Sequence, residues 1–454
     1  MAIGLVLARR VGSTKDFFVA GRSLGPGLIF STMLAANIGA GSTVGATAIG
    51  YSGGLSAWWW VGSAAVGSAI LALWIGPKMR RIAAEHDLRT VGDYLEFRYG
   101  ASVRGVIAAL LWIGSIFILA GQLVAIGSIL NTVANVPAAA GCAIGGVVIM
   151  VYFAAGGLAT SVRVNVIQLA VKLGGFAIAL PLAIGAIGGW QGLTQVETRD
   201  PAYWSFWQPG PPGLMYVALL TPSFIVSPGL LQKVFGARDD HAVRVGVGLN
   251  ALGLLLYAIV PVLLGIAARS RFPDLVPINN ALPMVLMHLL PPAVGAIGLA
   301  AVFSAEISAS DAVLFMLTTS LSQDFYKRVV RPQAGDAEIL TVARATSVVA
   351  SLLAVALAIA LGSVVDALTI FYTLLSVSLF VPILAGLYLS RATTPEALAS
   401  IGCGVAAVVV MQVTTGGRGI AGMTPALVGL LAAMAGFSAI FVSRSRRSRG
   451  QAAV

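Results

Sequence analysis

Long apolar stretches alternate with short polar ones along almost the whole chain of 454 residues. A membrane-spanning helix needs about 20 mostly apolar residues, and such runs recur roughly every thirty to forty residues. The pattern predicts about twelve helices, at roughly 27–52, 56–80, 102–134, 137–156, 160–188, 213–235, 240–268, 291–323, 340–362, 365–390, 395–413 and 423–443. We therefore expect an all-α polytopic membrane protein with a single transmembrane domain, 1–454.

Two of the predicted helices contain helix-breaking residues at membrane depth. The first carries NIGAGST (37–43), and the sixth carries SPG (227–229). These helices begin two successive sets of five, 27–189 and 212–391, and an odd number per set places the sets in opposite orientations. The last two helices, 395–443, lie outside both sets. Either break alone could serve packing, but paired breaks in inverted halves are typical of secondary transporters.

The charges are distributed unevenly between the loops. The formal charge of +11 does not indicate nucleic acid, because Lys and Arg gather in alternate loops and in the tail, Arg444 to Arg449. This asymmetry places the first loop and the C-terminus in the cytoplasm. A short basic tail and loops without cysteine suit a bacterial inner membrane. The stretch from Trp190 to Pro212 is rich in tryptophan and is predicted to form an aromatic cover on the outer side.

The reactive residues are too few and too scattered for an enzyme. Two cysteines, Cys142 and Cys403, and three dispersed histidines form neither a disulfide framework nor a metal or catalytic cluster. No cofactor is therefore expected. Met1 to Leu7 is too short to span and lacks the order of a signal peptide, so we interpret it as the end of a truncated leading helix.

Five runs of the sequence resemble motifs of the sodium:solute symporter family. They are KDFFVAGRSLG (15–25), LRTVGDYLEFRYG (88–100), AGQLVAIG (120–127), SPGLLQKVFGARD (227–239) and SLSQDFYKR (320–328). The resemblance implies the LeuT-type fold, with two inverted five-helix repeats and a solute site at the midplane between core helices 1 and 6. It also implies a cation between helices 1 and 8, and import by alternating access with sodium as the coupling ion.

The resemblance implies a sodium site built from backbone carbonyls and two adjacent hydroxyls on helix 8. Carried over to this chain, the carbonyls come from Ala35, Ile38 and Ala305, and one hydroxyl comes from Ser308. The second hydroxyl position is Ala309, which departs from the family. Because sodium is a hard cation that binds several oxygens, the loss of one ligand is expected to weaken the site.

Ionisable residues lie inside predicted spans near this site. Asn165 stands where many relatives have an acidic residue, and Lys172, two helical turns further on, lies about 10 Å nearer the midplane, about where the sodium would sit. A buried ammonium can occupy a monovalent cation site. On helix 8, Glu306 and Asp311 are charges that usually pair within a membrane, and Lys172 is the expected mate. A static ion pair and a cation or proton relay both remain open.

The solute site is predicted from polar and aromatic residues near the breaks. The candidates are Asn37, Gly39, Ser42, Trp59, Gln122, Phe224 and Ser227. Trp59 stands where sugar-transporting relatives tend to have a carboxylate, which disfavours a sugar. Half-helix N-termini aimed at the midplane suit a carboxylate, so a monocarboxylate or an amino acid is the first expectation.

Three functions fit these features. The first is a symporter that imports a small organic solute with sodium across the lipid bilayer. The second is a sodium-independent or proton-coupled transporter of the same fold, in which Lys172 fills the sodium site. The third is a non-transporting membrane sensor on the same scaffold. A channel is disfavoured because no polar filter ring is evident.

Overall fold

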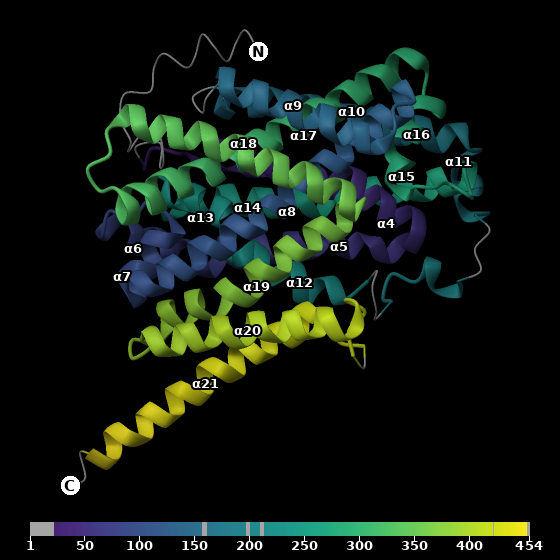
Figure 1. Ribbon diagram of the computed structural model, residues 1–454. Helices are drawn as coiled ribbons and strands as arrows, with labels where there is room; N and C mark the ends of the chain where they lie inside the picture. Colours follow the sequence, from purple (N-terminus) through teal and green to yellow (C-terminus); the bar gives the residue numbers. More distant parts are fainter. Residues whose placement is uncertain (1–21, 157–160, 197–199, 209–212, 421, 452–454) are drawn as a thin grey trace.

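A computed structural model describes residues 22–156, 161–196, 200–208, 213–420 and 422–451 (Figure 1). These residues form helices and connecting turns, without a β-strand in the described ranges. The α-helices are α3 Pro26–Asn37, α4 Ala46–Gly53, α5 Trp58–Ile70, α6 Gly76–Glu85, α7 Val91–Tyr99, α8 Ala101–Ala134, α9 Ala138–Gly156, α10 Ser161–Ala186, α11 Gly189–Thr194, α12 Met215–Val226, α13 Pro228–Phe235, α14 Asp240–Tyr257, α15 Ile259–Arg271, α16 Ala281–His288, α17 Pro292–Thr319, α18 Asp336–Leu361, α19 Val364–Tyr388, α20 Thr394–Thr415 and α21 Pro425–Gln451. Segments of π-helix cover Gly41–Gly45, Leu71–Ile75 and Ser320–Val330, and short 3-10 turns cover Gly54–Ala57, Pro201–Trp204 and Ile278–Asn280.

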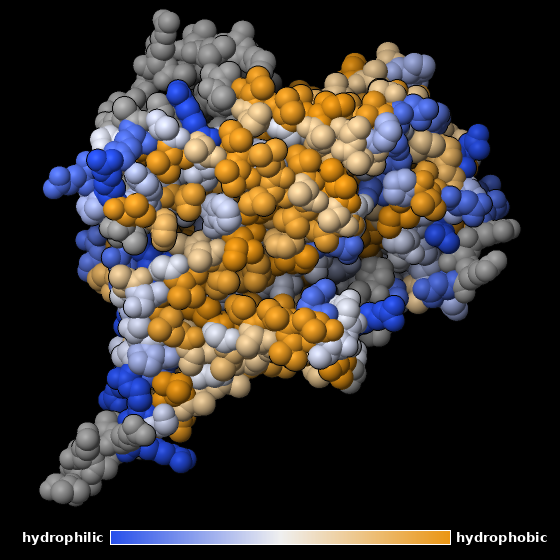
Figure 2. Space-filling model, in the orientation of Figure 1, coloured by the Kyte–Doolittle hydropathy of each residue, from blue (hydrophilic) through white to orange (hydrophobic). Residues whose placement is uncertain are grey.

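The surface confirms a multi-pass membrane protein. Within the described residues, nine helices are long and apolar enough to cross a membrane, and two shorter apolar helices accompany them. Figure 2 shows a broad hydrophobic band over the middle of the helices, with hydrophilic residues gathered toward its two ends. Because lipid cannot satisfy exposed backbone groups, a bundle of helices is the expected solution. The assignment of one hydrophilic end to the cytoplasm stays a prediction.

The first predicted break is present. Helix α3 ends at Asn37, and Ile38 leaves the helical region with φ −91° and ψ 80°. The chain then turns through Gly39 and Ala40, and re-enters helical geometry as the π-helix Gly41–Gly45 before α4. Glycine loses more backbone entropy in a helix than other residues do, so the two glycines favour a break here.

The second break is narrower than predicted. Helix α12 ends at Val226, and Ser227 takes φ −53° and ψ 121°. Pro228 and Gly229 already belong to α13, where proline occupies the first turn. Proline has no N–H, and the N–H groups at the start of a helix have no partner within the helix. Pro228 therefore fits the first turn of α13, although it could not continue α12. The interruption is therefore confined to Ser227.

Several short helices were not predicted from the sequence. Helix α7 lies in a stretch predicted as a loop, because it is amphipathic and shorter than a membrane span. It begins with a capping box, in which the Thr90 hydroxyl accepts from the Asp93 N–H and the Asp93 carboxylate accepts from the Thr90 N–H. The other predicted ranges coincide with helices or interrupted helices, but two end too early: α21 runs to Gln451 instead of 443, and the helical segment that follows α17 runs to Val330 instead of 323.

The described residues of the aromatic loop pack over the junction of α4 and α5. The Tyr203 hydroxyl donates to the carbonyls of Gly50 (3.1 Å) and Tyr51 (3.3 Å), and Tyr203 is buried. Gly54 adopts φ +67°, and a Cβ there would lie 2.0 Å from the Tyr203 carbonyl oxygen. Only glycine fits this close approach. The loop thus covers one end of the first core helix, as an aromatic cover would.

Candidate ion and solute sites

The side-chain ammonium group of Lys172 binds to the C-terminal end of α3. Lys172, on α10, donates from Nζ to the carbonyl oxygen of Ile38 at 2.6 Å and to that of Ala35 at 3.3 Å. Its side chain is only 4% exposed. The break leaves these carbonyls without helical N–H partners, and the C-terminus of a helix carries partial negative charge. A cation at this point therefore satisfies both the carbonyl oxygens and the helix dipole.

The surroundings of the ammonium match part of the expected cation site. A small cavity of about 10 Å³ beside Lys172 is also lined by Thr43 and Ala305, and Ala305 is fully buried. Such a space is at the lower limit for one water molecule. Ala309 faces the break itself, since a Cβ on Gly39 would lie 3.4 Å from the Ala309 Cβ. The side chains of Asn165, Ser308 and Asp311 lie outside the described residues.

Glu306 lies near Lys172 but does not pair with it directly. Its Oε1 accepts a hydrogen bond from the Thr43 hydroxyl at 3.1 Å, while its buried Oε2 has no hydrogen-bond partner in the described part of the chain. The two charges still interact electrostatically. Of the two alternatives left open for Lys172 and Glu306, a static ion pair and a relay, the described contacts include no direct ion pair between them. The ammonium binds backbone carbonyls instead, because the break presents two of them at hydrogen-bonding distance.

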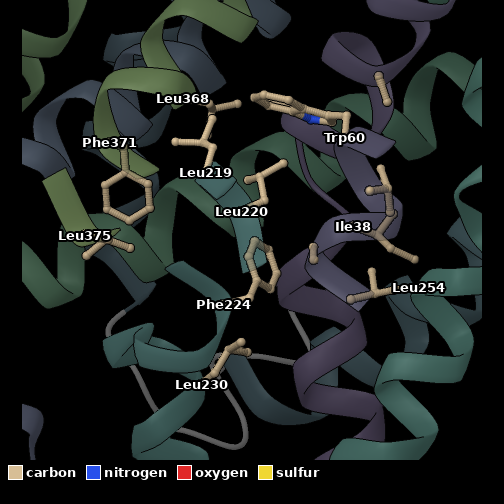
Figure 3. Packing of buried hydrophobic residues seen from close by; sticks show 14 of the residues in the cluster. Ile38, Trp60, Leu219, Leu220, Phe224, Leu230, Leu254, Leu368, Phe371 and Leu375 are labelled. Atoms are coloured by element: carbon tan, nitrogen blue, oxygen red, sulfur yellow. The ribbon is translucent and has the colours of Figure 1, made fainter. Parts of the chain in front are cut away.

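A larger cavity lies on the other side of the first break. Its volume is about 210 Å³, which is ample for a small solute, since one water needs about 10–15 Å³ of such space. Figure 3 shows Phe224 of α12 between Ile38 on one side and Phe371 and Leu375 of α19 on the other. Phe224 and Tyr372 have ring centroids 5.6 Å apart. Ala36 of α3 lines the cavity and is exposed, so part of the broken helix is accessible from it.

Six of the seven predicted solute residues line this cavity: Asn37, Gly39, Ser42, Gln122, Phe224 and Ser227. Several of their polar side chains already form hydrogen bonds within the protein, at or near the break in the first core helix. The Asn37 amide donates to Asn250 Oδ1 at 3.1 Å, and the Ser42 hydroxyl donates to the Asn37 carbonyl at 2.7 Å. Gln122 Oε1 accepts from the Ala40 N–H at 3.2 Å. The contacts of Ser42 and Gln122 satisfy backbone groups that the interrupted helix leaves free.

Trp59 does not line the cavity. Its indole N–H donates to the Phe206 carbonyl at 2.9 Å, and its ring contacts Phe206 and Trp207 of the aromatic loop. The neighbouring Trp60 lines the cavity and donates from Nε1 to the Gly41 carbonyl at 2.8 Å. The prediction was wrong by one residue, because one residue rotates a helical side chain by about 100°.

Lys233 is a cavity residue that the sequence pattern did not single out. It lies in the last turn of α13, is partly buried, and is the one charged residue among those that line the cavity in the described structure. The signal that could have found it is the same one that marks Lys172 and Glu306, an ionisable residue within a predicted span.

Comparison with known proteins decides the family. The model of the sodium:solute symporter family matches residues 17–404 of the chain. The chain belongs to this family. Similar proteins include the high-affinity choline transporter 1 of Caenorhabditis elegans, 25% identical over 87% of this chain and 70% of that protein. A sodium/glucose cotransporter of Vibrio parahaemolyticus is 26% identical over 86% and 78%, and the sodium/pantothenate symporter of Escherichia coli is 27% identical over 71% and 69%.

Solved structures show the same fold. An outward-open sialic acid symporter aligns over 96% of this chain and 93% of its own, with a TM-score of 0.78 at 17% identity. A closed nucleobase-cation-symport transporter, Mhp1, aligns over 94% of each chain with a TM-score of 0.56. The architecture is therefore that of LeuT-type transporters. As a sodium:solute symporter, the protein is a membrane transporter and not an enzyme, and the family favours sodium as the coupling ion and a small solute as cargo.

Proposed function

We propose that this symporter imports a small organic solute by alternating access, with the ammonium of Lys172 occupying the position of the coupling cation. The hydrogen bonds from Lys172 Nζ to the Ala35 and Ile38 carbonyls carry the proposal. The resemblance places a sodium ion at these same carbonyls, and a single site cannot hold both cations. Ala309 strengthens the inference, because it lacks the hydroxyl that the family supplies to sodium.

In this scheme, protonation of Lys172 couples to the contact between α10 and α3. The charged amine is attracted to the carbonyls at the end of α3, and loss of its proton weakens that attraction. Glu306 is the nearest described acid, with Thr43 between the two. Tyr257, whose ring packs on Phe176, is a further ionisable group that feels the charge of Glu306. We place Lys172 and Glu306 in a proton relay, to which Asn165 and Asp311 belong by their positions on α10 and α17.

Sodium coupling is the second candidate, and family membership favours it. It requires Lys172 to leave the carbonyls of Ala35 and Ile38, so that these oxygens, the Ala305 carbonyl and Ser308 bind the ion. The two candidates share one site and differ in which cation fills it during transport. They therefore make opposite predictions for the same substitution at Lys172.

The proposed solute is a monocarboxylate or an amino acid. The names of similar proteins mention choline, glucose, pantothenate and sialic acid, so similarity does not indicate the chemical class of the solute. The cavity does limit the size of the solute, because a volume of about 210 Å³ suits a small molecule. Helix α13 begins at the cavity, and the partial positive charge of a helix N-terminus favours an anionic group.

Uptake into proteoliposomes tests the coupling. Labelled monocarboxylates and amino acids are offered to wild type and to Lys172→Ala, with either an inward proton gradient or an inward sodium gradient. The lysine mechanism predicts that the proton gradient drives wild-type uptake and that Lys172→Ala loses it. Sodium-driven uptake that persists in Lys172→Ala would eliminate the lysine mechanism and support the second candidate. Absence of uptake under both gradients would favour a non-transporting sensor.

A further inference from the structure

Lys233 gives the solute cavity a single positive charge. The other residues that line it in the described structure are neutral, and most are apolar or aromatic. The side chains of α17 that line the cavity, Ala309, Val313 and Met316, are all apolar. No charged group of the described residues acts on Lys233. A positive charge in a cavity with low-dielectric walls attracts small anions.

Four other polar groups of the cavity are less available to a ligand. Asn37, Ser42 and Gln122 bond to the broken helix or to Asn250, and the Trp60 indole bonds to the Gly41 carbonyl. The three donors of Lys233, by contrast, have no hydrogen-bond partner among the described residues. A charged group held within a membrane protein without a partner is typical of a substrate or ion pathway.

Gly229 leaves space next to this charge. It lies four residues before Lys233 on α13, so the two residues share one face of the helix, and both line the cavity. A Cβ built on Gly229 would meet no atom within 4 Å. A ligand can therefore lie over Gly229, one helical turn from the ammonium.

We propose that Lys233 and Gly229 form a carboxylate subsite, in which the Lys233 ammonium binds the carboxylate of the solute and the bare backbone at Gly229 makes room for it. This rests on the proposed function and specifies its substrate class, small organic anions. The apolar and aromatic walls, including Phe224 and Leu230, then receive the rest of the solute. Neutral solutes of the same shape are excluded because they leave the ammonium desolvated and unpaired.

Matched pairs of ligands test this subsite whatever the natural solute is. Purified full-length protein is melted with propionate, lactate, pyruvate, glycine or 4-aminobutyrate, and in parallel with the corresponding amides, which keep the shape but lose the charge. Wild type is expected to be stabilised by at least one acid, with an apparent affinity at least tenfold higher than for its amide. Equal affinity for acid and amide, or binding of none of the acids, would overturn the proposal.

Substitutions localise the effect. Lys233→Met is expected to abolish the preference for the acid, whereas Lys233→Arg retains it within about threefold. Gly229→Ala adds a methyl group to open space, so it should fold normally yet weaken acid binding at least tenfold. Gly248→Ala is its matched control, since this helical glycine of α14 also has nothing within 4 Å and does not line the cavity. Retention of the preference in Lys233→Met, or unchanged affinity in Gly229→Ala, would contradict the subsite.

These outcomes are independent of the coupling mechanism. Transport of a neutral solute by wild type, driven by either gradient, would remove the carboxylate subsite and leave the proposed transport intact. Binding of acids without any uptake would support the carboxylate subsite and refute the transport function.

Discussion

The two lysines inside the membrane region differ in what surrounds their ammonium groups. Lys172 is almost fully buried, and two backbone carbonyls at the end of α3 accept its hydrogen bonds. Lys233 lines the solute cavity and has no such acceptor among the described residues. One charge is thus satisfied by the protein itself, whereas the other is left for a ligand.

This difference separates two roles within one binding region. A buried charge is stable only when its hydrogen bonds are made, so the interrupted helix and Lys172 stabilise each other. An unpaired charge beside water retains part of its hydration and can exchange that water for a carboxylate. Substitutions that remove Lys172 from the cation site, or that change charges elsewhere, measure whether cation binding and solute binding are separate.

The largest effect is expected from returning the cation site to a sodium-binding form. In the variant Lys172→Ala/Ala309→Ser, the carbonyls of Ala35 and Ile38 are free and the second hydroxyl is restored. Sodium at about 100 times its dissociation constant should then stabilise the protein by about 2.7 kcal/mol, and the melting temperature measures this gain against equal potassium.

The matched control for that variant is Ala309→Ser alone. Here the lysine still fills the site, so sodium should have no specific effect, as in wild type. Sodium stabilisation of wild type equal to that of the double variant would show that Lys172 does not compete for the site.

The next effect concerns Glu306. Glu306→Gln removes the buried charge and keeps an oxygen that accepts from Thr43, so thermal stability should be retained or rise. Proton-driven uptake should nevertheless fall about tenfold or more, which corresponds to about 1.4 kcal/mol. Uptake that is unchanged at every pH would exclude Glu306 from the relay and leave it a structural residue.

A smaller effect is expected at the aromatic loop, where Tyr203 contacts neither lysine. Tyr203→Phe removes the hydroxyl that bonds to the Gly50 and Tyr51 carbonyls, and should cost about 1 kcal/mol of stability. Because Tyr203 takes no part in binding cation or solute, the sodium response and the preference for acids over amides should not change. A change in either would link this loop to the binding region.

Much of the fold was predictable, because membrane helices depend on long apolar runs that can be read directly. The first break was predictable because glycines cluster at membrane depth, and the position of Lys172 followed from helical spacing. The partner of Glu306 was not, since hydrogen bonding to Thr43 depends on how α17 packs against the first core helix. Trp60 rather than Trp59 faces the cavity because of the rotation of α5, which follows directly on the 3-10 turn Gly54–Ala57. Spacing along the chain does not give that rotation.

The smallest effect provides a baseline outside the membrane-spanning segments. Glu338 accepts hydrogen bonds from the Tyr326 hydroxyl at 2.7 Å and from Arg331 at 2.8 Å, and these two contacts lower the pKa of its carboxyl group. A lowered pKa in the folded state stabilises the protein above the unfolded pKa of about 4.3, and this contribution is lost as the pH falls through the folded pKa. Glu338→Gln should therefore melt slightly below wild type at pH 7, and the difference should disappear in acid below about pH 4. The effect is small because water and salt screen exposed charges. A melting difference that instead changed between pH 6 and pH 9 would mean that this surface cluster is coupled to the ionisable groups around Lys172, and the two regions could no longer be treated as separate.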